Sequence, residues 1–240
     1  MELMIDKNLN YGRHHIADFL KKSLPYTTVV DLGAGQGDDL MLAKKQNPDA
    51  VLYALESYAP YVKTLKEKGI NVFSVDLEKD RLPFEDESID VVMINQVFEH
   101  VKEVFWIMHE VTRVLKVGGH FIIGVPNLAS LHNRLLLLIG NQPTCIQNDS
   151  AHVRGYTRND FFKLLDSGFP GGYKLEQFGG SNFYPFPAVI AKPLARLFPT
   201  MAWSMFMLLK KERSYMDDGY AKFPITKQLE TNFFTGPYSR

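Results

Sequence analysis

Short apolar runs alternate with longer amphipathic segments along most of the chain. The apolar runs are typical of buried strands, and the amphipathic segments are typical of helices that cover them. Strands are predicted at 29–32, 51–55, 71–75, 89–94, 120–125, 173–178 and 205–209. Helices are predicted at 38–46, 60–68 and 103–116, and from Thr157, where Asp160 completes a capping pair, to about Gly168.

This alternation of strands and helices is typical of a parallel sheet with helices on both faces. The predicted fold class is therefore α/β, with a doubly wound sheet of seven strands. Ligands bind such sheets at the carboxyl ends of the strands, near the point where the strand order reverses. We expect residues 28–211 to form this domain and residues 212–240 to form a tail of uncertain order.

The most informative segment is a glycine-rich turn between the first strand and the first long helix, VVDLGAGQGDD at 29–39. Glycines let the backbone turn sharply and approach a ligand closely. A dinucleotide fingerprint would have its third glycine where Asp38 stands, and Asp38 and Asp39 would repel a pyrophosphate at the helix N-terminus. The turn therefore favours a nucleoside-like ligand without phosphate, although similar turns also serve only to pack a helix on a strand.

Acidic residues follow the next two predicted strands. Glu56 ends the second strand, where a carboxylate can accept both hydroxyls of a ribose. Asp76 follows the third strand, where it can accept from an adenine amino group while Leu77 lies against the ring. Each acid alone could be an ordinary solvated loop residue. Their succession at neighbouring strand ends favours a nucleoside site.

With these motifs the sequence resembles the class I methyltransferases that use S-adenosylmethionine, in their small-molecule branch (the type 11 and type 23 methyltransferases). The resemblance runs from about Thr28 to Gly124 and continues more weakly to about Lys211. It rests on VVDLGAGQG, YALE, VDLEKDRLPFEDESIDVVMINQVFEHV and VLKVGGHFIIGVPN. It implies a Rossmann-like, mostly parallel sheet with an antiparallel last strand near 204–209, and a helical lid at 1–27.

The resemblance also assigns the cofactor-binding residues. For the methionine part it implies Asp31, Gly33, Ala34, Gly35 and Gly37; for the ribose Glu56 with Ser57; for the adenine Asp76 and Leu77; beside the sulfonium Asn95 and Gln96; and for the cofactor carboxylate Arg13. Arg13 could equally lie on a solvated helix face.

Charge and composition narrow the class of acceptor. The chain has 27 Lys and Arg against 27 Asp and Glu, so it lacks the basic excess of a nucleic-acid-binding protein. The sequence after the fourth strand is Asn95-Gln96-Val97-Phe98, without the Pro-Pro-aromatic motif of nucleic-acid amino-methyltransferases. The partner is thus expected to be a small molecule, with no nucleic acid. The oligomeric state stays open.

The cysteine content and the N-terminus bear on location. The single Cys145 fits a reducing compartment, and MELMIDKNLNYGRHH lacks the apolar core of a signal peptide, so the cytoplasm is expected. The longest apolar stretch, 183–209, is broken by four prolines and carries two cations, so no transmembrane segment is expected. Peripheral membrane contact stays open, since 183–213 has five cations against Glu212 alone.

Methyl transfer from a sulfonium needs an aligned acceptor and no metal, and a base helps when the acceptor is a hydroxyl. His100 and His152 are the candidate bases, although each also has a plausible structural role. Apolar runs in two acceptor-side insertions, at about 127–152 and 183–203, predict a mostly apolar acceptor chamber. A hydrophobic acceptor, or one linked to a lipid or glycan, would fit such a chamber.

The main hypothesis is an enzyme that transfers a methyl group to an oxygen, nitrogen or carbon atom of a small molecule. The alternative is a protein that binds S-adenosylmethionine without catalysis, as a sensor or a partner subunit. A dehydrogenase of similar topology is disfavoured by Asp38.

Overall fold

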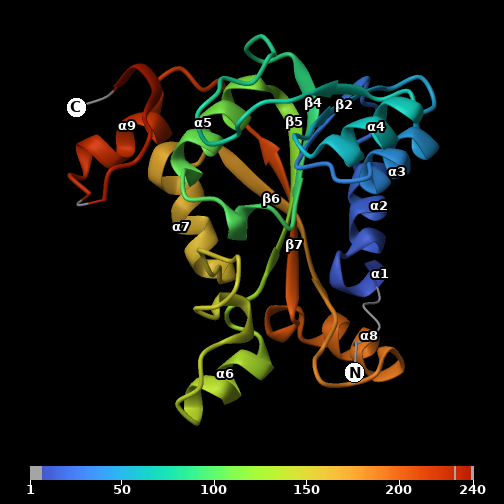
Figure 1. The fold of residues 1–240 in the computed structure, drawn as a ribbon, viewed down its shortest axis with the longest axis vertical. Helices are drawn as coiled ribbons and strands as arrows, with labels where there is room; N and C mark the ends of the chain where they lie inside the picture. Colours follow the sequence, from blue (N-terminus) through green and yellow to red (C-terminus); the bar gives the residue numbers. More distant parts are fainter. Residues whose placement is uncertain (1–6, 230, 239–240) are drawn as a thin grey trace.

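A seven-stranded sheet runs through the centre of the protein (Figure 1). The structure is a computed structural model that describes residues 7–229 and 231–238. Its strands are β1 (Thr28–Leu32), β2 (Val51–Leu55), β3 (Asn71–Phe73), β4 (Ile89–Asn95), β5 (Leu115–Pro126), β6 (Tyr173–Ser181) and β7 (Ser204–Lys211), in the order β3-β2-β1-β4-β5-β7-β6. The first five strands are parallel, and β7 is antiparallel to both β5 and β6. The predicted fold class, including the antiparallel last strand, is confirmed.

Helices cover both faces of this sheet (Figure 1). The helices of the described residues are α1 (Lys7–Asn10), α2 (Arg13–Lys22), α3 (Asp38–Gln46), α4 (Ala59–Glu67), α5 (Val104–Val114), α6 (Leu131–Leu138), α7 (Arg158–Gly168), α8 (Ala188–Leu197) and α9 (Gly219–Thr226). Of these, α6 and α8 lie at the lower end of the molecule, away from the two faces (Figure 1). Neighbouring residues of a strand face opposite sides, so Val29 packs with α2 and α3 while Val30 packs with α5 and α7. The apolar runs of the sequence are the strands that these two layers bury.

Three local features differ from the sequence prediction. Strand β3 ends at Phe73, and β5 starts at Leu115, directly after α5. The proline-rich segment contains α8, which has Pro193 inside it. The sequence predicts no element in this segment and excludes only a transmembrane one; Pro187 stands at the N-cap of α8, where no backbone N–H is needed, so the helix starts normally. The predicted cap of α7 is present, since Thr157 Oγ1 accepts from the Asp160 N–H at 3.2 Å.

The C-terminal segment packs on the domain over its described residues, 212–229 and 231–238. Helix α9 lies against α5 and α7. Tyr220 is fully buried, and its hydroxyl donates to the carbonyl of Leu165. The segment therefore adds apolar contacts to the core on this face of the sheet. The first six residues of the expected lid lie outside the described residues, and the rest of it forms α1 and α2.

Lys211 closes the last strand with a fully buried ammonium group. Its Nζ donates to the carbonyls of Thr112 and Leu115, at 2.9 and 2.7 Å, and lies 3.2 Å from a Glu87 carboxylate oxygen. These carbonyls lie at the C-terminal end of α5, where a cation is favoured by the helix dipole. Burial lowers the pKa of Lys211, and Glu87 opposes that shift.

Replacing Lys211 by Met should lower the free energy of unfolding, because two buried carbonyls would lose their donor. We expect a loss of about 2 kcal/mol in denaturant unfolding. Lys210→Met is the matched control, since Lys210 is half-buried and lies 3.9 Å from Glu212, a contact worth less than about 0.5 kcal/mol. Equal stability of the two variants would contradict the role given to Lys211.

Candidate functional site

A cavity of about 600 Å³ opens where β1 and β4 end, next to α2 and the start of α3. From β1 the chain continues to β2 and β3 on one side of β1 and then crosses to β4 on the other side of β1. The strand order therefore reverses between β1 and β4, where the cavity lies. The lining residues are Tyr11, Arg13, Asp31, Gly33, Ala34, Gly35, Gln36, Asp38, Asp39, Tyr61, Asn95, Gln96, Glu99, His100, Pro126, His152 and Trp203. The cavity therefore lies at the place where the fold class predicts a ligand.

The glycine turn forms one wall of the cavity. Gly33 and Gly35 have positive φ angles of 75° and 54°, which side chains disfavour. A Cβ atom on Gly33 would lie 2.6 Å from a methyl carbon of Val97, so only glycine fits there. Space around Gly35 is open, which leaves its backbone accessible from the cavity.

The predicted ribose ligand lies behind this turn. Glu56 Oε2 accepts from the N–H of Gly35 at 2.9 Å, and Oε1 accepts from the N–H groups of Ser57 and Tyr58 at 2.9 and 2.8 Å. The Glu56 carboxylate thus fixes the shape of the glycine turn. It is not among the cavity-lining residues, and neither are Gly37 and Ser57.

The predicted adenine residues also lie outside the cavity. Strand β3 is short, so Asp76 stands in the loop after it, where it accepts from the N–H of Glu78 at 3.0 Å and lies 3.4 Å from Lys79. Leu77 packs against the main core. Their contact with a cofactor stays a prediction.

Two buried carboxylates give the cavity its charge. Asp31 lies in the buried part of β1, and its pKa is raised well above the usual value by burial and by the charges of Asp39 and Glu56. Burial also raises the pKa of Asp39, although Asn95 and Arg13 oppose the shift. Because the charged forms of both acids are disfavoured, a cationic ligand in this cavity would be stabilised by them.

Arg13 of the N-terminal segment compensates part of this charge. Its guanidinium lies 2.9 Å from Asp38 and 3.3 Å from Asp39, and 5.4 Å above the ring of Tyr11. Asn95 Nδ2 donates to the other Asp39 oxygen at 2.8 Å and to the Tyr11 carbonyl at 3.0 Å. Arg13 therefore ties α2 to the start of α3. It also weakens the argument that Asp38 and Asp39 repel phosphate, since their charge is shared with a cation.

Three buried polar atoms in the cavity wall have no hydrogen-bond partner within residues 7–229 and 231–238. They are Asn95 Oδ1, Gln96 Nε2 and Glu99 Oε2, all from the end of β4 and the turn after it. Gln96 also has a positive φ of 57°, which is rare for a residue other than glycine. Unpaired buried polar atoms are costly, so their concentration at one cavity indicates a polar ligand.

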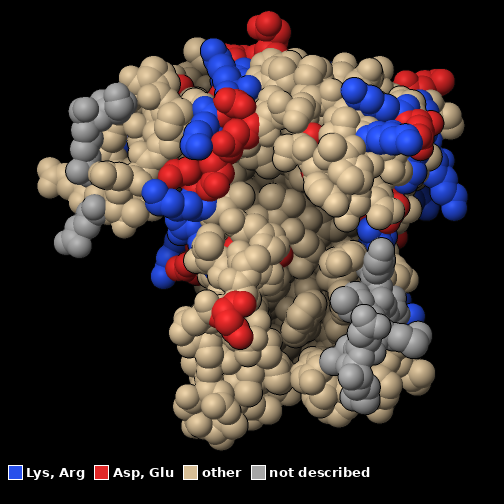
Figure 2. Space-filling model, in the orientation of Figure 1, with Lys and Arg blue, Asp and Glu red and all other residues tan. Residues whose placement is uncertain are grey.

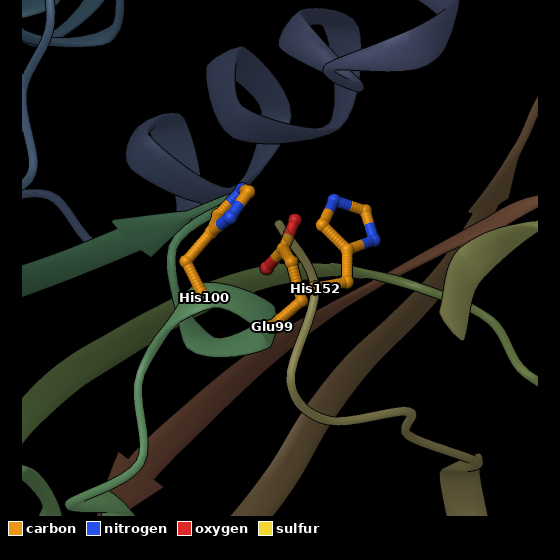
Figure 3. A group of neighbouring side chains, drawn as sticks. All are labelled: Glu99, His100 and His152. Carbon is orange, nitrogen blue, oxygen red and sulfur yellow. The ribbon is translucent and has the colours of Figure 1, made fainter. Parts of the chain in front are cut away.

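Both candidate bases line the same cavity, next to Glu99 (Figure 3). The rings of His100 and His152 lie 4.6 Å apart. Burial lowers the pKa of His100, and the neighbouring His152 lowers it further. Burial raises the pKa of Glu99 to about 7. Glu99 was missed as a site residue, although it stands beside His100 in the FEHV motif; only its burial in the fold marks it.

The residues on which the prediction of a mostly apolar acceptor chamber rests do not line this cavity, so the chamber stays a prediction. Of the two expected insertions, only His152 and Trp203 line the cavity. The leucines of α6 and the aromatic segment 183–187 lie outside it, because their side chains pack on each other or face solvent. Most residues of the cavity wall are polar or charged, among them its acids, amides and histidines.

The fold is similar to that of solved methyltransferases. A SAM-dependent methyltransferase from Archaeoglobus fulgidus matches with a TM-score of 0.58 at 19% identity, over 87% of this chain and 98% of the other.

Sequence relatives cover less of the chain. A 37.1 kDa transposon protein of Streptomyces fradiae is 30% identical over 151 residues, 61% of this chain and 40% of its own length. A malonyl-[acyl-carrier protein] O-methyltransferase of Herminiimonas arsenicoxydans is 31% identical over 113 residues, 47% of this chain and 42% of its own length. The chain thus spans less than half the length of these curated relatives.

Residues 30–123 match the family model of the methyltransferase domain. This range runs from β1 into β5 and contains the glycine turn, Asp31, Asn95 and Glu99. The match agrees with the strand order and with the position of the cavity at the end of β1. Over residues 30–123 the chain is therefore similar to the methyltransferase domain family, and its fold is that of the solved SAM-dependent methyltransferase.

Proposed function

We propose that the protein transfers a methyl group from S-adenosylmethionine to an oxygen, nitrogen or carbon atom of a small hydrophobic acceptor in the cytoplasm. The observation that carries the proposal is the cavity at the end of β1, with its two buried acids and three unpaired polar atoms. The mostly polar wall fits an amino-acid and nucleoside cofactor better than an apolar ligand.

The cavity residues fit the charges of this cofactor. Asp31 and Asp39 would stabilise a cationic ligand, and both the sulfonium and the ammonium of S-adenosylmethionine are cationic. Asn95 Oδ1 is a free acceptor for an ammonium, and Gln96 Nε2 is a free donor for a carboxylate. Glu56 already accepts three backbone N–H groups, and the remaining lone pairs of its two oxygens could accept ribose hydroxyls.

The chain contributes position and proton acceptance to the transfer. S-adenosylmethionine supplies the methyl group on a good leaving group, so alignment of the acceptor is the main requirement. His100 and His152 face the cavity from the turn after β4 and from the loop before α7. The lowered pKa of His100 keeps its ring neutral near neutral pH, which is the form that accepts a proton.

An apolar surface next to the cavity supports a hydrophobic acceptor. We define the apolar surface by exposed residues of α6 and α8 and their neighbours: Leu135, Leu137, Leu138, Ile139, Phe186, Val189, Ile190, Leu197 and Phe198. Leu138 and Val189 are 81% and 85% exposed. Leu131 of α6 packs on the small cluster formed by α8, so both helices belong to one lobe. Figure 2 shows few charged side chains at this lower end of the molecule.

The charges around the apolar surface favour an anionic membrane as its partner. Neither 128–148 nor 183–211 contains an acidic residue. Lys192 and Arg196 are exposed on α8, on the same side as Val189, which is typical of a helix lying in a membrane interface. The other cations of this stretch, Lys210 and Lys211, lie at the far end of β7 and do not contribute. No helix in the described residues is long and apolar enough to cross a bilayer.

Asp31→Asn should weaken binding of S-adenosylmethionine, because the amide keeps the shape but removes the negative charge. We expect a loss of about tenfold or more in affinity by isothermal titration calorimetry. Asp49→Asn is the control, since Asp49 is exposed in the loop before β2. This loop lies at the amino ends of the parallel strands, opposite the cavity at their carboxyl ends. An unchanged affinity in Asp31→Asn would contradict the assignment of the cavity.

The double variant Leu138→Glu/Val189→Glu should lose binding to anionic phospholipid vesicles. Each substitution places a charge where a side chain would enter the interface, so we expect at least about tenfold weaker cosedimentation. Val117→Glu is the control, because Val117 is an exposed residue near the amino end of β5, whereas the insertion that contains α6 follows the carboxyl end of that strand.

Product formation over a panel of acceptors completes this test. Faster turnover of lipid-linked acceptors than of polar ones by the wild type, lost in the double variant, would support the acceptor class. Cofactor binding without turnover of any acceptor would instead favour the non-catalytic alternative. Equal vesicle binding by all variants would contradict the membrane surface.

A further inference from the structure

Glu99, His100 and His152 form a compact cluster at one wall of the cavity. Glu99 and His100 stand in the short turn Phe98–His100 after β4, and His152 stands in the loop before α7. One ligand atom from each residue lies within 4.8 Å of the other two. Figure 3 shows the Glu99 carboxylate between the two imidazole rings. The cluster therefore brings a carboxylate and two imidazoles to one point.

The protonation pattern of the two histidines leaves one nitrogen of each ring free to bind a cation. His152 Nδ1 lies 2.8 Å from the carbonyl oxygen of Cys145, and His100 Nδ1 lies 3.3 Å from that of Ala151. A carbonyl only accepts, so each Nδ1 carries the proton and each Nε2 keeps a lone pair. Histidine ligands of metals usually have this arrangement, with the second ring nitrogen donating to a carbonyl or carboxylate.

Glu99 supplies the negative charge. Its side chain is 2% exposed, and Oε2 has no hydrogen-bond partner among the residues that the structure describes. A buried carboxylate without a partner is costly, and a bound cation would remove that cost.

The backbone holds the two parts of the cluster together. The carbonyl of Glu99 accepts from the N–H groups of Val153 and Arg154, at 2.8 and 3.3 Å. The Cys145 segment, whose carbonyl orients His152, is itself held by Asn133, which donates from Nδ2 to Cys145 Sγ at 3.3 Å. The positions of the ligand side chains thus follow from main-chain pairing and from a hydrogen-bonded support.

We propose that Glu99, His100 and His152 bind a divalent transition-metal ion, which holds an oxygen of the acceptor. Two imidazoles and a carboxylate are a ligand set typical of Zn²⁺ and other first-row transition metals, whereas Mg²⁺ prefers oxygen ligands. A point between three atoms separated by 4.8 Å lies at most about 2.8 Å from each. Zinc ligands lie about 2.1 Å from the metal, so shifts of about 0.7 Å per side chain suffice.

This inference rests on the proposed function and narrows its acceptor to an oxygen nucleophile. Three protein ligands leave coordination positions open toward the cavity, as in catalytic zinc sites. A divalent cation held by these residues would lower the pKa of an acceptor hydroxyl, whose proton would pass to solvent, and would so favour attack of the oxygen on the methyl group, with S-adenosylhomocysteine as the leaving group. As ligands of the cation, His100 and His152 would assist deprotonation of the hydroxyl through the metal, which replaces the direct proton acceptance described under the proposed function.

The experiment measures metal binding directly. Protein stripped with a chelator is titrated with Zn²⁺ by isothermal titration calorimetry, with Mg²⁺ in a second titration. We expect one Zn²⁺ per chain, much weaker Mg²⁺ binding, and a loss of at least about tenfold in zinc affinity in Glu99→Gln and His152→Ala. Circular dichroism checks that both variants are folded, and His100→Asn, at an exposed ring, gives a third variant.

The matched control is the double variant His120→Ala/Glu176→Gln. His120 Nε2 lies 3.1 Å from Glu176 Oε2, so this pair also combines an imidazole and a carboxylate, on β5 and β6 away from the cavity. Its zinc affinity should equal that of the wild type. Equal zinc affinity in the wild type and the three cluster variants, or a zinc site lost in the control, would overturn the proposal.

Titration of the same samples with S-adenosylmethionine separates this inference from the proposed function. Zinc binding without cofactor binding would leave the metal site in place and contradict methyl transfer. Cofactor binding and full turnover of an acceptor by a protein that binds no zinc would contradict the metal site and leave methyl transfer in place.

Discussion

The position of β1 between two parallel neighbours is the constraint on which the site depends. β1 pairs with β2 from Thr28 to Leu32 and with β4 from Val29 to Asp31. The chain leaves β1 toward one neighbour and reaches the other only after two more strands, so no connection covers the end of β1. The glycine turn then lets the backbone leave the strand sharply. A polar crevice beside buried Asp31 is the direct result of this topology.

The electrostatics of the crevice depend on one contact between segments far apart in the sequence. Asp31 and Asp39 are both buried, and their mutual repulsion disfavours the folded protein with both acids charged. Arg13 and Asn95 hydrogen-bond to Asp39, and the charge of Arg13 also opposes the rise in the pKa of Asp31. Arg13 belongs to α2 and Asn95 ends β4, so the same contacts that place the N-terminal helices also prepare the site for a cation.

Local patterns predicted the fold well and the site in part. The strands follow from apolar runs, and Asp31, Gly33 and Gly35 follow from a turn whose geometry only glycine allows. The pairing of Arg13 with Asp39 and the burial of Glu99 depend on packing between distant segments, so neighbouring residues carry no signal of them. The leucines of α6 were misplaced for a related reason, since apolar residues in sequence do not reveal whether they face a cavity or the outer surface.

The polar cavity and the apolar surface would bind different parts of one acceptor. A polar wall binds charges strongly but gives little affinity for a hydrocarbon chain, whereas the lobe of α6 and α8 exposes hydrocarbon and cations outside the cavity. The insertion after β5 links the two, because it carries the leucines of α6 and also the Cys145 carbonyl that orients His152. An acceptor with an oxygen head and an apolar body would therefore contact both ends of the same insertion. Its apolar body would lie against α6, and its oxygen would reach the cluster of Glu99, His100 and His152.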